Sequence, residues 1–368
     1  MKVAYDQQIF AAQRFGGISR YFFELIRHLP ELEGASVQCR VFSPLYINNY
    51  LSNSDSRFRV SGLFMPALKN TGVIRRTLND FLVPYLLRGW GPDILHETYY
   101  AERSASIKNC RTVITVYDMI HELFPGFFVN DLSTLRRKKA AIDRADHIIC
   151  ISENTKNDLV RLYDVPVDKM TVVHLGFALV KSPAKDIIIP NRPYILYVGS
   201  RGGYKNFDRM LEAYRQSPRL HQNYDLVAFG GGGFSPSEKS KIATLGFDDV
   251  QVRQVSGDDA VLGVYYKNAS LFVYPSLYEG FGIPPLEAMA FGCPVACSNT
   301  SSIPEVVGNA ASLFDPYDVA SIADVMMSVI DDSVLQEELR RNGAARIQLF
   351  SWRRCARETL QVYQRILQ

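Results

Sequence analysis

The stretch PSLYEGFGIPPLEAMAFGCPV, residues 275–295, decides the fold of this chain. An apolar β-type run ends here, and two glycines, Gly280 and Gly282, then break the strand period. Pro284 and Pro285 favour the first turn of a helix, because the N–H that proline lacks would have no partner there. A strand, a glycine turn and a helix in this order are typical of an α/β domain with a parallel sheet.

Short β-type runs alternate with helical patterns on both sides of this stretch. In the first half of the chain the expected strands are residues 2–6, 38–44, 93–97, 111–118 and 147–152. In the second half they are residues 194–200, 225–230, 250–256, 270–276, 293–297 and 311–314. Such alternation predicts parallel sheets with helices on both faces.

Two prolines and a loss of the apolar period mark residues 176–192 as a linker. We therefore expect two doubly wound, Rossmann-like domains, one over residues 1–180 and one over residues 181–351. The last segment, 352–368, is a helix candidate that could pack back on the first domain. Because ligands bind outside the carboxyl ends of parallel strands, we expect the two domains to face each other across a ligand-binding cleft.

The composition narrows the class of protein. The chain has 368 residues, 47% apolar and 21% charged, which is typical of a globular protein. A net charge of +3 is too small to indicate a nucleic acid partner. The first residues lack a signal peptide pattern, no apolar run reaches the length of a membrane span, and the six cysteines are scattered. We therefore expect a cytoplasmic protein with reduced cysteines and no metal site.

The glycine turn and the helix start together predict an anion site. The N–H groups that would face an anion are those of Gly280, Phe281, Gly282 and Ile283. The positive end of the helix dipole adds to them, so a diphosphate fits. Glu279 and Glu287 flank this turn. Their carboxylates would repel a bound phosphate, so their presence here indicates that they bind another group. Sugar hydroxyls are such a group, because a carboxylate accepts strong hydrogen bonds from them.

At this point the sequence resembles the family-four retaining glycosyltransferases, whose signature has two glutamates at this spacing. The resemblance covers most of the chain and is strongest over residues 194–318. It implies a GT-B fold and transfer of a hexose from a nucleoside diphosphate sugar, with the anomeric configuration retained. It also implies that Glu279 lies near the donor sugar and that Glu287 binds the ribose hydroxyls.

A second glycine turn, in YVGSRGGYKNF (197–207), carries two cations. Gly199 lies near the end of the expected strand and is a candidate donor-binding residue, and Arg201 and Lys205 follow it. Fixed positive charges that meet the negative charge of a leaving diphosphate lower the barrier to reaction. A basic turn of this kind is otherwise a solvated surface feature. The resembled family has a basic pair here, which favours a phosphate role, more for Lys205 than for Arg201.

Two further glycine-rich turns follow expected strands. In FGGISRY (15–21), Gly16 and Gly17 lack the three-glycine spacing of a dinucleotide fingerprint, and such a pair is usually a plain turn. The resembled family has a glycine pair here that contacts the donor, so we expect Gly16 and Gly17 to do so. AFGGGGF (228–234) is expected to pack on the donor side without a catalytic role.

The acceptor side departs from the family pattern. In VITVYDMIHELFP (113–125), Tyr117 and Asp118 stand where the family commonly has His-Asp. Either His121 replaces the missing histidine, or the Tyr117 hydroxyl does, and both alternatives are left open. The candidate catalytic residues are therefore Glu279, Lys205, Arg201, His121 and Asp118.

Two basic stretches, residues 69–90 and 135–144, have two interpretations. The simpler is a solvated face, and the other is transient contact with anionic lipid head groups or a lipid-linked acceptor, which would put the protein at the inner face of a membrane.

The sequence thus predicts a retaining hexosyltransferase that needs no cofactor and no divalent metal. Its donor would be GDP-mannose or a UDP-hexose, and its acceptor a hydroxyl of a glycan or lipid-linked saccharide in bacterial surface polysaccharide synthesis. Two alternatives use the same architecture: a sugar-nucleotide epimerase, which would need acid–base residues at the sugar ring, and a non-catalytic subunit that binds nucleotide sugars. The sequence leaves the oligomeric state open.

Overall fold

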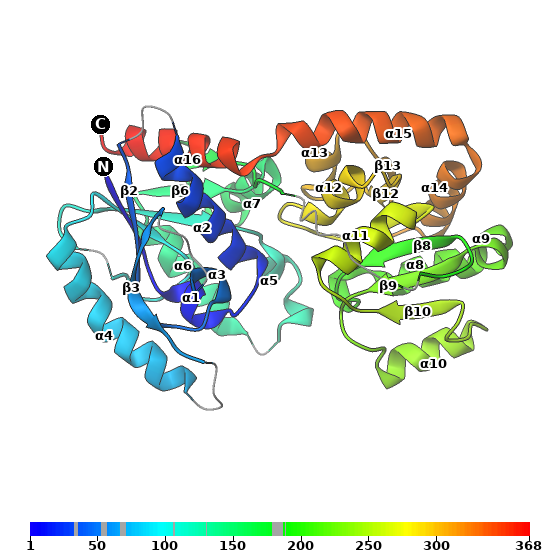
Figure 1. Ribbon diagram of the computed structural model, residues 1–368, viewed down its shortest axis with the longest axis horizontal. Coiled ribbons are helices and arrows are strands. Elements are labelled where there is room, and N and C mark those ends of the chain that lie inside the picture. Colours follow the sequence, from blue (N-terminus) through cyan, green and yellow to red (C-terminus); the bar gives the residue numbers. More distant parts are fainter. Residues whose placement is uncertain are drawn as a thin grey trace. The chain divides into compact units, whose positions relative to one another are not determined.

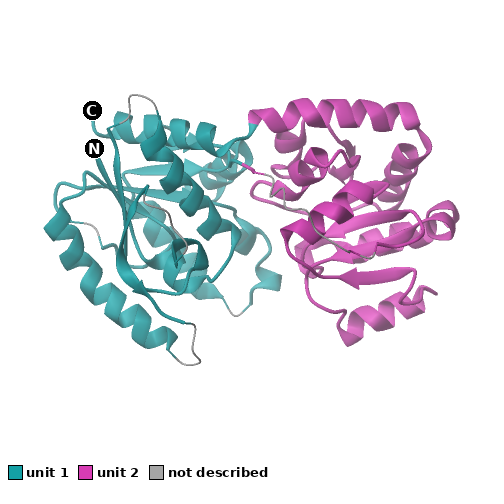
Figure 2. Ribbon diagram, viewed as in Figure 1, with its two compact units in different colours: residues 1–176, 350–368 teal, residues 177–349 magenta. Residues whose placement is uncertain are grey.

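The computed structural model describes residues 1–32, 36–52, 57–66, 71–105, 107–129, 131–178, 187 and 189–368. The chain divides into two compact units (Figure 2). Unit 1 comprises residues 1–176 and 350–368, and unit 2 comprises residues 177–349. The boundary predicted at residue 180 lies outside the described residues, and the C-terminal segment belongs to unit 1.

Unit 1 is built on a parallel sheet of seven strands in the order β3-β2-β1-β4-β5-β6-β7 (Figure 1). The strands are β1 (Lys2–Tyr5), β2 (Gln38–Tyr46), β3 (Arg59–Phe64), β4 (Ile94–Glu97), β5 (Arg111–Val116), β6 (His147–Cys150) and β7 (Met170–Val172). Its helices are α1 (Gln8–Ala12), α2 (Gly17–His28), α3 (Asn49–Ser52), α4 (Gly72–Trp90), α5 (Ile120–Leu123), α6 (Leu132–Arg144), α7 (Glu153–Tyr163) and α16 (Trp352–Ile366).

Unit 2 has a parallel sheet of six strands in the order β10-β9-β8-β11-β12-β13. The strands are β8 (Tyr194–Val198), β9 (Asp225–Phe229), β10 (Val252–Val255), β11 (Leu271–Tyr274), β12 (Val295–Ser298) and β13 (Ser312–Phe314). Its helices are α8 (Phe207–Gln216), α9 (Pro218–Asn223), α10 (Pro236–Thr244), α11 (Asp259–Asn268), α12 (Ile283–Ala290), α13 (Ile303–Val307), α14 (Val319–Asp331) and α15 (Ser333–Arg346).

The prediction of two doubly wound α/β halves is confirmed. In each sheet the strand order reverses once, between β1 and β4 in unit 1 and between β8 and β11 in unit 2. A crevice opens at such a reversal, outside the carboxyl ends of the two strands. Two strands were missed: β3, an edge strand interrupted by Gly62, and β7, which has three residues.

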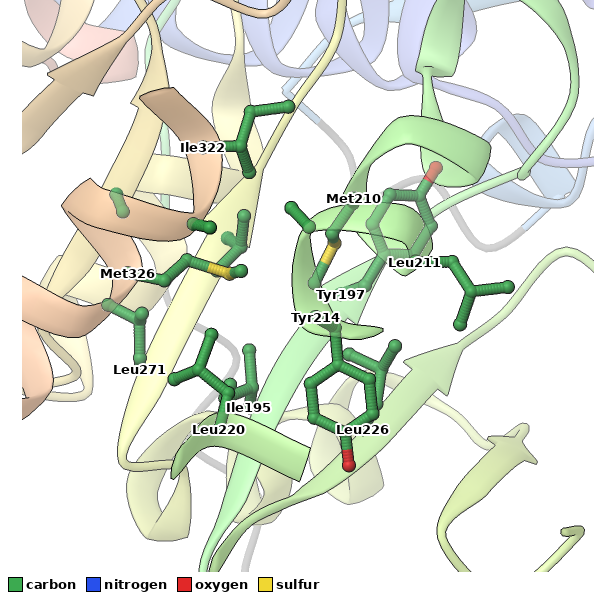
Figure 3. Packing of buried hydrophobic residues seen from close by; sticks show 14 of the residues in the cluster. Ile195, Tyr197, Met210, Leu211, Tyr214, Leu220, Leu226, Leu271, Ile322 and Met326 are labelled. Carbon is green, nitrogen blue, oxygen red and sulfur yellow. The ribbon is translucent and has the colours of Figure 1, made fainter. Parts of the chain in front are cut away.

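The core of unit 2 lies where α8, α9 and α14 cover one face of its sheet (Figure 3). Ile195, Leu226 and Leu271 project from the three central strands and meet Met210 of α8 and Met326 of α14. All five side chains are fully buried. Strands buried on both faces explain why β8, β9 and β11 appear in the sequence as continuous apolar runs.

The C-terminal helix α16 completes the core of unit 1. Its Tyr363 hydroxyl lies 2.6 Å from His96 Nδ1 and 3.1 Å from the Tyr5 hydroxyl, and all three side chains are fully buried. The other His96 nitrogen, Nε2, lies 2.9 Å from the Thr115 hydroxyl. Burial lowers the pKa of His96 to about 3, so the imidazole stays neutral at physiological pH. His96 is therefore a structural group that joins β4 and β5 to α16.

The basic stretch of residues 135–144 differs from the prediction of a solvated face. It lies on α6, and its Lys138 is fully buried. Lys138 Nζ lies 2.8 Å from the Glu122 carboxylate and donates to the Asp118 carbonyl oxygen at 2.9 Å. One of the four consecutive basic residues thus belongs to the interior, because a partner carboxylate and a carbonyl satisfy its charge. None of the helices in the described residues is long and apolar enough to cross a membrane.

A buried carboxyl group at the end of β1 makes unit 1 sensitive to pH. Asp6 Oδ1 accepts hydrogen bonds from the Thr98 N–H at 2.9 Å, the Thr98 hydroxyl at 2.6 Å and the Gln8 N–H at 3.3 Å. Burial, together with the nearby Glu97 carboxylate, raises the pKa of Asp6 to about 7 in spite of the lowering effect of these hydrogen bonds. The native state therefore binds a proton that the unfolded chain has lost above pH 4.

We expect Asp6→Asn to stabilise the protein above pH 7. A pKa raised from 3.8 to about 7 costs native stability progressively as pH rises through that window, up to about 4 kcal/mol. Asparagine keeps the accepting oxygen without the charge. Urea unfolding should show a stability difference between variant and wild type that is near zero below pH 4 and grows to a plateau above pH 7. A difference independent of pH would contradict a raised pKa.

Candidate functional site

The strand reversal in unit 2 brings together two residues that are 74 positions apart. Lys205 ends the turn after β8, and Glu279 lies in the turn after β11. Lys205 Nζ lies 2.7 Å from Glu279 Oε1, and the two side chains are 19% and 11% exposed. A cation and a carboxylate that are both largely withdrawn from water attract each other strongly. The sequence predicted both residues for the site but not that they pair.

The turn after β11 is held from both sides by the turns of its neighbouring strands. On the β8 side, Asn206 donates to the Pro275 carbonyl oxygen at 3.0 Å, and the Leu277 N–H donates to the Tyr204 carbonyl oxygen at 2.8 Å. On the β12 side, the Ser302 hydroxyl donates to the carbonyl oxygens of Glu279 at 2.8 Å and Phe281 at 2.9 Å. The position of Glu279 is therefore fixed by the backbone as well as by Lys205.

Gly282 turns the chain into α12. Its φ of 106° lies in the region that favours glycine, and the helix begins at the next residue, Ile283. Pro284 and Pro285 follow and have no N–H. The N–H groups around this helix start are those of residues 280–283, with the positive end of the helix dipole behind them. This arrangement can bind an anion, as predicted for Gly280 to Ile283.

Two buried tyrosines orient the two glutamates. Tyr274, the last residue of β11, hydrogen-bonds to Glu279, and the Tyr266 hydroxyl of α11 donates to Glu287 Oε2 at 3.3 Å. Burial raises the pKa of both tyrosines well above the ordinary value, and the neighbouring glutamate raises each further. Both hydroxyls therefore stay protonated and can donate to a carboxylate. Glu287 is half-buried on the first turns of α12.

Arg201 lies in the loop as predicted, but its described contacts are with the protein itself. Its side chain is 3% exposed, and Nε lies 2.7 Å from Glu238 Oε1. Its two terminal nitrogens donate to the carbonyl oxygens of Gly230 at 2.8 Å and Gly232 at 2.9 Å. The guanidinium also lies over the Phe234 ring, 4.8 Å from its centroid. Arg201 thus organises the glycine turn after β9, and its predicted phosphate role stays a prediction.

Three glycines of that turn, Gly230, Gly231 and Gly232, have φ values of 84°, 68° and 75°. A Cβ added at Gly231 would lie 2.8 Å from the Gly199 carbonyl oxygen and 2.7 Å from the Arg201 guanidinium. The turn therefore needs glycine for both its conformation and its close approach to the β8 turn. Gly199 itself has a φ of 131° and donates its N–H to the Phe229 carbonyl oxygen at 3.0 Å.

In unit 1, Gly16 and Gly17 lie at the start of α2. The short helix α1 separates them from β1, so they do not follow the strand directly. Gly16 is extended, and a Cβ there would lie 2.3 Å from Gln13 Oε1, whereas Gly17 has open space around its Cα. Gly17 therefore leaves the helix start accessible, which is compatible with the predicted donor contact.

The candidate acceptor residues lie around α5. The Asp118 carboxylate accepts from the Ile120 N–H at 3.2 Å, and the Tyr117 side chain is buried. Burial raises the pKa of Tyr117 well above its ordinary value. His121 Nε2 lies 3.3 Å from Asp131 Oδ2, and its ring lies 4.2 Å from the Phe128 ring. Of the two candidates to replace the family histidine, His121 is the more exposed, with 19% of its side chain exposed, while Tyr117 is buried.

Sequence reasoning missed the groups that support the glutamates. Tyr274 could have been noticed, because it is the polar end of an otherwise apolar strand, immediately before the predicted anion site. Ser302 and Tyr266 had no local signal, since their importance comes from the packing of β12 and α11 beside β11. Among the described residues, no group of three histidine, cysteine, aspartate or glutamate side chains is placed to hold a metal ion.

Comparisons with known proteins show which family this chain resembles along its length. A family model described as glycosyl transferases group 1 matches residues 181–346, and one described as glycosyltransferase family 4 matches residues 15–181. The chain is 28% identical to the O-antigen chain mannosyltransferase B of Escherichia coli, over 94% of this chain and 95% of that protein. It is 29% identical to the serotype-specific mannosyltransferase WbdA of Escherichia coli over 70% of this chain, which spans 34% of that longer protein.

Two solved structures show the same fold. The sucrose-phosphate synthase of Thermosynechococcus elongatus matches with a TM-score of 0.74 at 22% identity, over 99% of this chain and 98% of that one. HepE of Anabaena, in complex with UDP-glucose, matches with a TM-score of 0.72 at 16% identity, over 98% of this chain and 100% of that one. The predicted fold class is therefore confirmed for the two parallel sheets.

We expect Arg201→Ala to destabilise the protein by about 2–4 kcal/mol, because it leaves buried carbonyl groups and Glu238 without their partner. Chemical unfolding should reveal this loss, and Lys239→Ala, an exposed neighbour on α10, should leave stability unchanged. Unchanged stability of Arg201→Ala, with weaker binding of a nucleoside diphosphate alone, would instead favour the predicted phosphate role.

Proposed function

This chain belongs to the family-four, group 1 glycosyltransferases, and from that premise we propose that it transfers a mannosyl unit from a nucleoside diphosphate sugar to a hydroxyl group of a growing bacterial surface polysaccharide. The single observation that carries the proposal is the Lys205–Glu279 pair at the strand reversal of unit 2, beside the start of α12. The choice of mannose rests on the names of the two relatives from Escherichia coli.

Each group of the site has a distinct task in this reaction. The N–H groups of residues 280–283, the dipole of α12 and the Lys205 ammonium would bind the diphosphate. Glu279, oriented by Tyr274, would accept hydrogen bonds from sugar hydroxyls. Glu287, oriented by Tyr266, would accept them from the ribose.

The Lys205–Glu279 pair also explains how a carboxylate can stand beside a phosphate site. When no nucleotide sugar is bound, the Lys205 ammonium and the Glu279 carboxylate, 2.7 Å apart, neutralise each other. When a diphosphate binds, the same ammonium lies between two anions and reduces their repulsion. Lys205 would thus hold Glu279 in place and stabilise the leaving group at the same time.

The chemical step breaks the bond between the anomeric carbon and the diphosphate oxygen, and its electron pair leaves with the diphosphate. The acceptor oxygen forms a bond to the same carbon, and its proton passes to the departing phosphate. We propose attack on the face that the diphosphate leaves, which retains the anomeric configuration. The contacts of Glu279 support this course, because its side chain interacts with Lys205 and Tyr274, which suits a carboxylate that binds hydroxyls more than a free nucleophile.

The donor is tested directly by a thermal-shift panel of UDP, GDP and ADP with their mannose and glucose derivatives. A ligand that binds only the native state raises the unfolding temperature by mass action, so the true donor should give the largest shift. Release of free nucleotide should then depend on an added saccharide acceptor. Release without any acceptor dependence would favour a nucleotide-sugar hydrolase, conversion of the donor into its epimer without nucleotide release would favour an epimerase, and absence of any shift would contradict the proposal.

We expect Lys205→Met and Glu279→Gln each to lower kcat by about 100-fold or more, because each removes a charge that acts on the transition state. Turnover of the donor with a saccharide acceptor measures this, and circular dichroism checks the fold. Lys267→Met, at an exposed lysine of α11, is the matched control and should keep full activity. Near-normal turnover of both site variants would exclude this pair from the reaction.

We further propose that the reaction needs no divalent metal, since Lys205, backbone N–H groups and a helix dipole converge on the predicted diphosphate position. Activity should therefore be unchanged after treatment with EDTA and dialysis. Loss of activity in EDTA that magnesium restores would show that a metal neutralises the diphosphate instead.

A further inference from the structure

Helix α4 of unit 1 is apolar on two opposite faces. One face is buried: Val83 and Leu87 pack against Phe42 of β2 and Leu95 of β4. The buried Asn79 amide fixes the rotation of the helix, because its Oδ1 accepts from the Leu45 N–H at 2.8 Å and its Nδ2 donates to the Leu45 carbonyl oxygen at 2.9 Å. The opposite face must therefore point away from unit 1.

This outward face exposes large apolar side chains in a continuous row. The row consists of Ile74, Leu78, Phe81, Leu82, Tyr85 and Leu86, whose positions i, i+4, i+7, i+8, i+11 and i+12 fall on one side of the helix. Ile74 and Phe81 are each 62% exposed, and Tyr85 is 58% exposed. Figure 1 shows α4 as an outer helix of unit 1. So many exposed large side chains on one helix exceed the scattered ones that a soluble surface normally carries.

The charges beside the row have one prevailing sign. The helix carries three arginines, Arg75, Arg76 and Arg88, against one acid, Asp80. Asp80 Oδ1 accepts from Gln7 Nε2 at 3.0 Å, and Asp80 Oδ2 lies 3.7 Å from Arg76 Nε, so this acid offsets one of the three arginines. Arg88, in contrast, lies at the border of the row, with its guanidinium 5.6 Å from the centroid of the Tyr85 ring.

A cation-rich hollow adjoins the same helix. It has a volume of about 720 Å³ and lies at the strand reversal of unit 1, between α1, α4 and the segment after β4. Four arginines line it, Arg75, Arg76, Arg103 and Arg137. Asp80 and Glu102 are the acids in its wall. The hollow lies on the inner side of α4, since Asn79 also lines it, and its arginines add to the positive charge of this part of unit 1.

We propose that α4 docks unit 1 on a lipid bilayer that contains anionic lipids. An exposed row of leucine, isoleucine and aromatic side chains bordered by arginines is what a helix needs to lie in the interface of such a bilayer. The positive charge of α4 and of the hollow favours an anionic lipid surface over a second copy of the chain, which would bring the same charge against it. The surface is independent of the donor site in unit 2, so it can be tested without reference to the reaction.

The test is flotation with vesicles of phosphatidylcholine, with and without phosphatidylglycerol. The wild-type protein should co-float with the anionic vesicles at low salt, and less as salt rises. Phe81→Ser combined with Tyr85→Ser should lower binding by about tenfold or more, since both side chains leave the apolar row. Arg88→Gln should lower it by about fivefold, on anionic vesicles only. Val250→Ser combined with Val334→Ser, two exposed valines of unit 2, is the matched control and should bind like the wild type.

Two outcomes would overturn the proposal: a wild-type protein that stays with the unbound fraction, or a Phe81, Tyr85 double variant that binds as the wild type does. Sedimentation equilibrium of the wild type and the double variant tests whether a second copy of the chain, and not a lipid surface, occupies this face. A wild-type dimer that dissociates in the double variant would assign the row to a second copy of the chain. Turnover with a water-soluble acceptor should be the same in the double variant and the wild type, which separates failure of docking from failure of the proposed reaction.

Discussion

The adjacency of β8 and β11 is the constraint on which the candidate site depends. These two strands are 74 residues apart at their turns, yet they lie side by side because the sheet reverses its order there. Their turns therefore leave the sheet at the same edge, and Lys205 meets Glu279 at 2.7 Å. The β12 turn then closes on the other side through Ser302. Three neighbouring turns thus fix one carboxylate.

Much of the fold could be predicted from the sequence, because buried strands and turns leave local sequence patterns. Strands buried on both faces leave continuous apolar runs, and glycines with proline leave a recognisable turn before α12. The two parallel sheets follow from such local patterns. The choice of Lys205 and Glu279 as candidate site residues also needed the resemblance to the family-four glycosyltransferases. The contact between Lys205 and Glu279 could not be predicted from these patterns, because it depends on which strands become neighbours in the sheet.

Other features could not be predicted because burial decides them. Lys138 belongs to a charged run, yet it is buried against Glu122, and nothing in the run distinguishes it from its neighbours. Arg201 follows a glycine turn as a phosphate-binding residue would, but its described partners are Glu238 and the carbonyl groups of the turn after β9. In α4 the apolar residues occupy both faces, so their pattern in the sequence does not tell which face is outside until Asn79 fixes it.

We propose that Glu279 and Lys205 serve a hexosyl transfer in which the acceptor attacks the face that the diphosphate leaves. The anomeric configuration of the product measures this most directly. An α-linked nucleoside diphosphate mannose and a saccharide acceptor, followed by proton NMR through the first turnovers, give the configuration before any later equilibration. Attack on the face that the diphosphate leaves predicts an α-mannoside. A β-mannoside as the first product would contradict it, because inversion requires attack from the opposite face and a different placement of the catalytic groups.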